Sequence, residues 1–144
     1  MTNQIEITID IDKLTNDYPN GNNNIPNPAN YISYEIISWT PDGAATAIFK
    51  DGEWDLTIPS DDSFTWYAIP KGKTINCEDI LLGSPSDSRA FQSEEKDGGN
   101  NSYECTMKDF NSAGENTSDC TLSIIYPVSG GKHYRWDPKI VIDR

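Results

Sequence analysis

The sequence predicts an all-β fold, an antiparallel β-sandwich of the immunoglobulin-like or jelly-roll kind with about eight or nine strands and little helix. Short runs of alternating apolar and polar residues recur about every ten residues, and clusters of Gly, Pro, Asn and Asp separate them. Helical periodicity is nearly absent. With 144 residues, 35% of them hydrophobic, the chain can bury a core as a single domain spanning residues 1–144.

The first predicted strand has one buried and one polar face. Its apolar positions alternate with Glu, Thr and Asp, and they are Ile5, Ile7, Ile9 and Ile11. A single helical turn is expected next, over residues 12–17, with Asp12 or Thr15 as its cap and Pro19 just beyond its end. This is the one place where the sequence predicts a helix.

The segment from Tyr18 to Tyr31 is rich in Asn and Pro, and we expect a surface loop that joins neither a strand ladder nor the core. A strand follows over residues 31–39, and Pro41-Asp42-Gly43 supplies a turn. Residues 44–50 are the expected hairpin partner of that strand.

Asp51-Gly52 is a second strong turn signal. The remaining strands are expected at residues 54–58, 64–69, 77–82, 103–108, 121–127 and 133–142. The last two should pair as a hairpin across a Gly-containing loop. Because Pro138 cannot donate a ladder hydrogen bond, its strand should bulge there, lie at a sheet edge or change sheets. Residues 83–119 are polar and carry no clear pattern beyond the strand at 103–108.

Composition excludes several classes of partner. Eleven basic and 23 acidic residues give a formal net charge of −12, which repels nucleic acid and anionic membrane surfaces. The sequence shows neither a signal peptide nor a membrane-spanning run, so a cytoplasmic location is expected. The three cysteines, Cys77, Cys105 and Cys120, are an odd number without metal-binding spacing and should be reduced thiols.

No catalytic residues are predicted. His133 is the only histidine, so a multi-histidine zinc site is excluded. A Ser-His-Asp triad would have to use this one residue, and the simpler interpretation is an exposed imidazole at a strand end. Phosphate-binding loops and the common hydrolase motifs are missing from the sequence. We therefore expect a protein that is not an enzyme and that needs no cofactor other than, at most, Ca²⁺.

A calcium site is one hypothesis for the first helical turn. Oxygen ligands recur there at short intervals, and they are Asp10, Asp12, Asn16 and Asp17. Ca²⁺ binds six to eight oxygen atoms of this kind. The pattern departs from an EF-hand because Leu14 stands between them, and the alternative is a solvated strand face followed by a capped turn.

Aromatic side chains suggest a carbohydrate site. Trp54, Trp66 and Trp136 lie within predicted strands and mostly fill the core, whereas Trp39, at a strand end before a turn, is expected to be exposed. Loop amides and carboxylates could bind sugar hydroxyls beside it. The predicted site residues are Trp39, Asn22, Asn23, Asn24, Asp97, Asn100 and Asn101.

Several motifs together resemble the AidA/PixA inclusion-body proteins of host-associated bacteria. They are an Ile-x-Ile-Asp strand motif at residues 9–12, a Leu-x-x-x-Tyr-Pro-Asn turn at 14–20 and a closing Tyr-x-Trp-Asp-Pro-x-Ile strand at 134–140. The resemblance covers most of the chain outside residues 85–119. It implies a non-enzymatic protein that accumulates in inclusions, as a homo-oligomer, by self-association or by binding a partner. The alternative is a lectin-like module that binds glycans, with or without Ca²⁺. Met1 and Met107 are the only methionines, so the chain is not methionine-rich.

Overall fold

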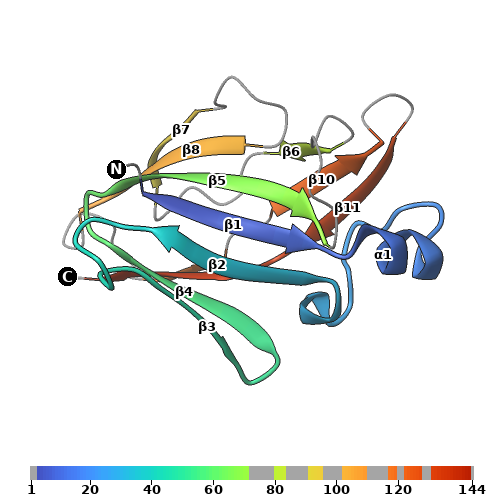
Figure 1. Ribbon diagram of the computed structural model, residues 1–144, viewed down its shortest axis with the longest axis horizontal. Coiled ribbons are helices and arrows are strands. Elements are labelled where there is room, and N and C mark those ends of the chain that lie inside the picture. The colour runs from blue at the N-terminus through green and yellow to red at the C-terminus, as the bar shows by residue number, and fades with distance from the viewer. Residues whose placement is uncertain are drawn as a thin grey trace.

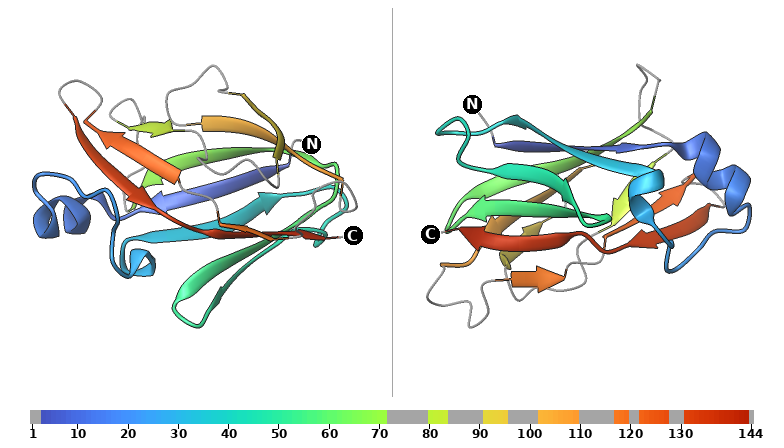
Figure 2. Two further views of the ribbon diagram at one scale, coloured as in Figure 1. Left: turned by 180° about the vertical axis from the view of Figure 1, so that it is seen from behind. Right: turned by 90° about the horizontal axis from the view of Figure 1, so that it is seen from below.

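The strands of the computed structural model face one another in two layers (Figures 1 and 2). The structure describes residues 3–71, 80–83, 91–95, 102–109, 117–119, 122–127 and 131–143. No helix in these ranges is long and apolar enough to cross a lipid bilayer. The all-β prediction is confirmed.

One layer is a five-stranded sheet in the order β2-β1-β5-β8-β7. Its strands are β1 (Gln4–Ile9), β2 (Ile32–Ser38), β5 (Ser63–Pro70), β7 (Phe91–Glu95) and β8 (Ser102–Met107). β1 and β5 pair in parallel, and the other neighbours are antiparallel. Burial alternates along β1 and β5, which confirms the period-two pattern predicted for β1.

The opposite layer consists of two smaller sheets. One has the order β3-β4-β12-β9, and the other has the order β11-β10-β6. Their strands are β3 (Thr46–Lys50), β4 (Glu53–Pro59), β6 (Leu81–Gly83), β9 (Thr117–Asp119), β10 (Leu122–Tyr126), β11 (Lys132–Trp136) and β12 (Lys139–Asp143). β12 pairs with β4 in parallel, so the sandwich is antiparallel with two parallel exceptions.

A single hydrophobic core lies between the layers. Trp66 of β5 is completely buried there, as are Leu56 and Ile58 of β4 and Ile140 of β12. Cys105 is a buried thiol that accepts a hydrogen bond from Trp66 Nε1 at 3.1 Å. The thiol prediction is confirmed for this cysteine, and Cys77 and Cys120 lie outside the described residues.

The N-terminal helix is longer than a single turn and has a different cap from the predicted one. α1 spans Ile11–Asp17, and Asp10 caps it by accepting a hydrogen bond from the Lys13 backbone N–H. Neither Asp12 nor Thr15 is the cap, because Ile11 already belongs to the helix and is buried with Leu14. The 3₁₀ helix η1 (Pro28–Asn30) follows in the next loop.

Pro138 marks a change of sheet, one of the three outcomes expected for it. The predicted strand 133–142 is divided into β11, which pairs with β10, and β12, which pairs with β4 and β9. The hairpin of the last two predicted strands is confirmed by the β10–β11 pairing.

The described residues contain twelve strands, more than predicted. β7 and β9 lie in the polar region where no alternation predicts a strand, and the break at Pro138 adds a third. Of the strand predicted at 77–82, the structure describes residues 80–82, and the observed β6 begins at Leu81.

Candidate functional site

The Asn-rich loop before β2 binds the edge of β11. The Asn22 N–H donates to the His133 carbonyl at 2.9 Å, and the Arg135 N–H donates to the Asn22 carbonyl at 3.0 Å. Ile25 donates to the Arg135 carbonyl and is buried. The prediction that this loop joins neither a ladder nor the core is therefore wrong: local composition indicated a loop, but an unpaired strand edge gave its backbone partners.

Gly21 is required for this close approach. Its φ of +87° lies in the left-handed region, and a Cβ at this position would come 2.7 Å from the His133 carbonyl oxygen. Asn22 also uses its side chain locally, because its Oδ1 accepts a hydrogen bond from the Asn24 N–H at 2.7 Å. Asn23 and Asn24 are exposed. Asn22 thus contributes its backbone groups and its Oδ1 atom to the structure of the loop.

Trp39 is buried, so the prediction that it is exposed is wrong. Only 2% of its surface is accessible. Its Nε1 donates to Asp62 Oδ2 at 2.8 Å, and its ring packs on Phe64 at a centroid distance of 5.5 Å. A buried indole has no free face for a sugar ring. The other proposed sugar ligands, Asp97, Asn100 and Asn101, lie outside the described residues.

The predicted calcium ligands have local roles. Asp10 caps α1 and lies 3.9 Å from Lys71 Nζ. Asp17 Oδ2 accepts a hydrogen bond from the Tyr31 hydroxyl at 2.7 Å. Asp12 and Asn16 lie on α1. Within the part of the chain that the structure describes, no three His, Cys, Asp or Glu residues form a group that could hold a metal ion.

Four of the described side chains have shifted pKa values, and one of them is Tyr134, whose pKa is raised by burial. The hydrogen bond to Asp17 raises the pKa of Tyr31, and burial is the next contribution. Burial, followed by a hydrogen bond to Glu6, raises the pKa of Tyr67 to about 12. Burial and the nearby Arg135 lower the pKa of His133, so this imidazole is neutral at neutral pH.

A row of aromatic rings runs from the surface through the core. Neighbouring centroids are 5.1 to 6.1 Å apart, which is the normal range for ring pairs. In order, the residues are Phe49, Trp54, Tyr34, Trp66, Phe64 and Trp39. The row joins both layers, and only its Phe49 end is widely exposed, at 53%.

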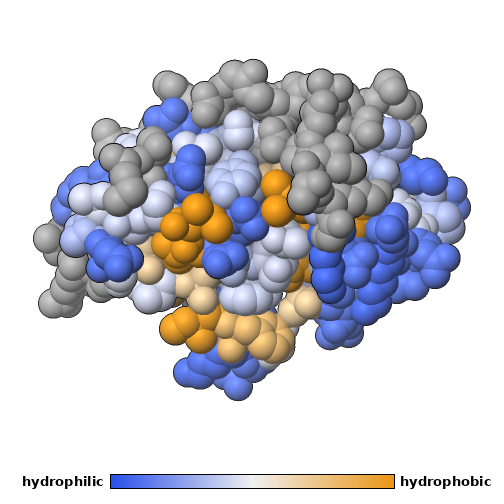
Figure 3. Space-filling model, viewed as in Figure 1, coloured by the Kyte–Doolittle hydropathy of each residue, from blue (hydrophilic) through white to orange (hydrophobic). Residues whose placement is uncertain are grey.

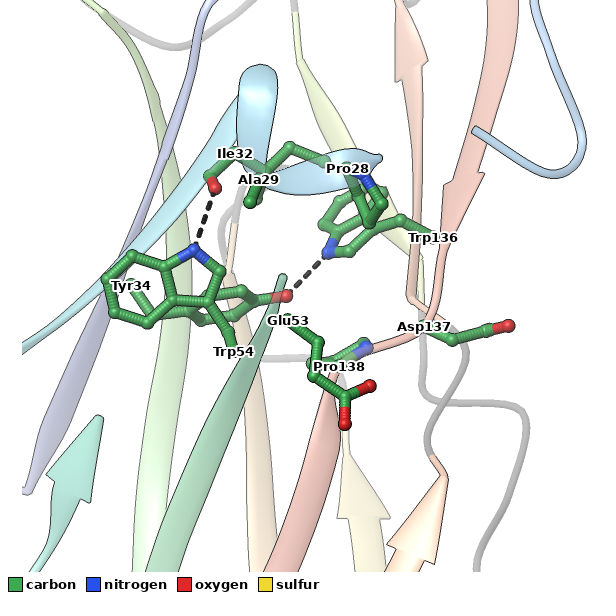
Figure 4. Close-up of a pocket in the computed structure, with 9 residues that line it drawn as sticks. All are labelled: Pro28, Ala29, Ile32, Tyr34, Glu53, Trp54, Trp136, Asp137 and Pro138. Atoms are coloured by element: carbon green, nitrogen blue, oxygen red, sulfur yellow. Dashed lines mark hydrogen bonds between the residues drawn. The ribbon is translucent and has the colours of Figure 1, made fainter. Parts of the chain in front are cut away.

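A pocket opens beside the outer part of this row (Figure 4). We call it the aromatic pocket. Trp54 of β4 and Trp136 of β11 lie on opposite sides of it, with Tyr34 of β2 between them, and η1 closes one end. Its lining consists of Pro28, Ala29, Ile32, Tyr34, Glu53, Trp54, Trp136, Asp137 and Pro138. Trp136 is the last residue of β11, just before the sheet change at Pro138.

A second, more polar pocket lies near the start of α1. Its volume is about 110 Å³, and Thr8, Asp10, Tyr31 and Lys71 are among its lining residues. Lys71 is 68% exposed and lies 3.9 Å from Asp10, a surface pair that adds little stability. The charges of Lys71 and Asp10 therefore partly neutralise each other within this pocket.

Two exposed apolar side chains are neighbours in the sequence of β3. They are Ile48 and Phe49, which are 55% and 53% exposed and point to opposite faces of the sheet, and we call the two together the β3 patch. Figure 3 shows apolar side chains gathered over the β3–β4 hairpin, which projects from the sandwich in Figure 1. Asp51 and Gly52 both have positive φ values, 52° and 83°, as expected of a two-residue hairpin turn.

The sequence analysis predicted neither the aromatic pocket nor the β3 patch. It assigned Trp54 and Trp136 mainly to the core, which is confirmed for Trp136, with 2% of its surface accessible, whereas Trp54 is partly buried and packs against the core. Trp54 lies close to the turn residue Gly52, and Trp136 lies close to Pro138, where the strand is interrupted. Aromatic residues beside such interruptions are signals that could have indicated a site. Nothing in the sequence showed that Tyr34 would lie between them.

Comparison with known proteins shows the fold. No family model and no curated protein matches the chain. Among solved structures, the crystal structure of an inclusion body protein (PixA) from Burkholderia cenocepacia J2315 matches with a TM-score of 0.59 and 10% identity, over 99% of this chain and 97% of that one. Domains EC1–3 of mouse clustered PcdhgC3 match with a TM-score of 0.35 and 12% identity, over 78% of this chain and 37% of that one. The PixA match confirms the predicted resemblance at the level of the fold.

Proposed function

We propose that this chain is a non-enzymatic protein of the inclusion-body type, which self-associates through the edge of β3. Two findings support the proposal: its fold is similar to that of a PixA inclusion body protein, and the β3 patch is exposed. The observation that carries it is the patch, because fold similarity alone does not establish function.

β3 is the edge strand of its sheet, and only β4 pairs with it in the described structure. Ile48 and Phe49 are consecutive, so their side chains point to opposite faces of the sheet. Both are more than half exposed, because the hairpin projects away from the sandwich (Figure 2). An apolar edge with unpaired backbone groups favours pairing with another strand.

The charge of β3 favours a second copy of this chain as the partner. The strand Thr46–Lys50 has one basic residue, Lys50, and no acidic residue, in a chain with a formal net charge of −12. Two acidic molecules would repel each other over most surfaces but not along this strand. An antiparallel, two-fold pairing centred on Ile48 would bury the patch of both copies.

The test measures mass against concentration by sedimentation velocity. The wild-type protein should form oligomers as its concentration rises. Ile48→Lys should remain monomeric at concentrations about tenfold above those at which the wild-type protein associates, because burying an unpaired ammonium group opposes the contact. The matched control is Ser33→Lys, the same charge change at an exposed residue of β2, and it should behave like the wild type. Equal association of the wild type and Ile48→Lys would reject β3 as the contact.

The structure gives no support to the carbohydrate-binding alternative. It depended on an exposed Trp39, and that side chain is buried. The absence of catalysis and the cytoplasmic location stay predictions from the sequence.

A further inference from the structure

The strands β3 and β11 each lie at the end of a sheet, but their outer edges differ. β3 has only β4 beside it in the described structure. β11 has β10 on one side and residues 21–25, which we call the strap, on the other. Figure 2 shows this part of the chain, in blue, passing beside β11. We propose that the strap closes the β11 edge against strand addition by a second copy of this chain.

The strap occupies the outward-facing backbone groups of β11. Along an antiparallel strand, the backbone groups of successive residues face opposite sides, so His133 and Arg135 face the strap and Tyr134 faces β10. The His133 carbonyl accepts from the Asn22 N–H at 2.9 Å. Arg135 donates to the Asn22 carbonyl at 3.0 Å and accepts from the Ile25 N–H at 3.1 Å. These are the groups that an added strand would need.

The strap is anchored at both ends. Ile25 at its far end is 3% exposed and belongs to the core. Just before its near end, the Tyr134 hydroxyl donates to the Tyr18 carbonyl at 2.8 Å, and the Gly21 N–H donates to the same carbonyl at 3.1 Å. Because these anchors lie on either side of Asn22, they hold its backbone against β11.

The strap itself is a poor template for a further strand. The Asn24 N–H donates to Asn22 Oδ1 at 2.7 Å, so this donor is used within the strap. Pro26, the next residue after the strap, has no N–H to offer. Covering β11 in this way therefore does not replace one regular edge with another.

Charge identifies the partner that the strap excludes. β11 carries Lys132 and Arg135, both exposed, and no acidic residue, in a chain with a formal net charge of −12. An uncovered β11 edge would attract acidic molecules, and other copies of this chain are acidic. The strap has no charged residue, so it covers the backbone of β11 without neutralising these side chains.

Closing β11 determines the form that an assembly can take. A copy with one pairing edge forms a closed two-fold pair, whereas copies with two pairing edges can continue to add to one another. The closure of β11 does not depend on the contact proposed for β3. Where both hold, the strap limits association to discrete pairs.

The experiment releases the strap with Gly21→Ala. A Cβ at this position would lie 2.7 Å from the His133 carbonyl oxygen, at a φ of +87°. The matched control is Gly43→Ala, which has a similar φ of +80° but no atom within 4 Å of the added Cβ. It reproduces the backbone strain without the clash. Asn22→Pro is a second release variant, because it removes the N–H that donates to His133.

Amide hydrogen exchange, followed by NMR, reports whether the edge is closed. In the wild-type protein the Arg135 amide should exchange at least about 100-fold more slowly than an unpaired amide. Both release variants should speed this exchange about tenfold or more, whereas Gly43→Ala should not. The Tyr134 amide, which faces β10, should stay protected in every variant and so report an intact sheet. Wild-type exchange at the rate of an unpaired amide, or no change in either release variant, would overturn the closure.

Sedimentation velocity then tests what the closure prevents, in the Ile48→Lys background that removes the proposed β3 contact. Ile48→Lys combined with Gly21→Ala should associate at concentrations about tenfold below those needed by Ile48→Lys combined with Gly43→Ala. Asn22→Pro should act like Gly21→Ala. Equal association of the double variants, with fast Arg135 exchange in the released one, would overturn the role of the strap. Association of Ile48→Lys alone would count against the β3 contact and not against the strap, which is judged by the difference between the double variants.

Discussion

Two tryptophans beside turns have opposite environments. Trp39 lies two residues before Pro41, and Trp54 lies two residues after Gly52. Local sequence predicted that Trp39 would be exposed and that Trp54 would fill the core. Instead, Trp39 is 2% exposed, whereas Trp54 is half-buried and lines the aromatic pocket.

The difference comes from the segments that lie against each ring. The turn between β4 and β5 brings Asp62 to Trp39 Nε1, and β5 places Phe64 against its ring. Trp54 belongs to a hairpin that projects from the sandwich (Figure 1), and its outer neighbour is the exposed Phe49. For an aromatic residue near a turn, burial is thus decided by distant segments and not by the adjacent residues.

The sharpest test of this comparison is truncation of both tryptophans. Trp39→Ala should lower the free energy of unfolding by about 3–5 kcal/mol, because it leaves a cavity and an unpaired Asp62. Trp54→Ala should cost about 1–2 kcal/mol, since part of this ring is already in water. Urea denaturation of both variants gives the values. Equal losses would show that the two environments do not differ energetically.

The hydrogen bond from Trp39 Nε1 to Asp62 should account for a smaller part of the stability lost in Trp39→Ala. Asp62→Ala should lower the free energy of unfolding by about 1.5 kcal/mol, because the buried indole N–H loses a charged acceptor. Asp62→Asn keeps an acceptor oxygen and should recover at least half of this loss in the same denaturation experiment. If Asp62→Ala left the free energy of unfolding unchanged, packing against Phe64 alone would hold Trp39 in place.

The smallest effect is expected at the exposed end of the aromatic row. Phe49→Ser should cost about 0.5–1 kcal/mol, the value of its ring contact with Trp54, since little of its burial is lost. The thermal unfolding midpoint should change by only a few degrees, while acrylamide quenching of Trp54 should increase. A loss as large as that of Trp39→Ala would show that the hairpin is part of the core.

Local patterns predicted what depends on neighbouring residues. The alternation along β1 and the Asp51-Gly52 turn appear in the structure where the sequence placed them, because side-chain period and turn geometry are properties of short segments. Pro138 likewise interrupts the ladder, since it lacks an N–H whatever surrounds it.

Features that depend on distant pairing were not predictable. The parallel pairs β1–β5 and β4–β12 join segments far apart in the chain, and no residue pattern records such a choice. The aromatic pocket needs Tyr34, Trp54 and Trp136 from three strands. Asn22 pairs with β11 because the backbone groups at that strand edge had no other strand beside them. The composition of the loop could not show this.

The parallel pairing of β12 with β4 has a consequence for how fast the chain folds. Lys139 lies beside Asp55, and Ile140 beside Leu56, so these neighbours can meet only after a long loop of chain has closed. Loop closure costs entropy before any contact compensates for it, and folds with many such contacts reach the native state in milliseconds to seconds. Until β12 docks, β4 keeps one edge unpaired, and that transient edge is where a folding chain would be open to pairing with the wrong strand.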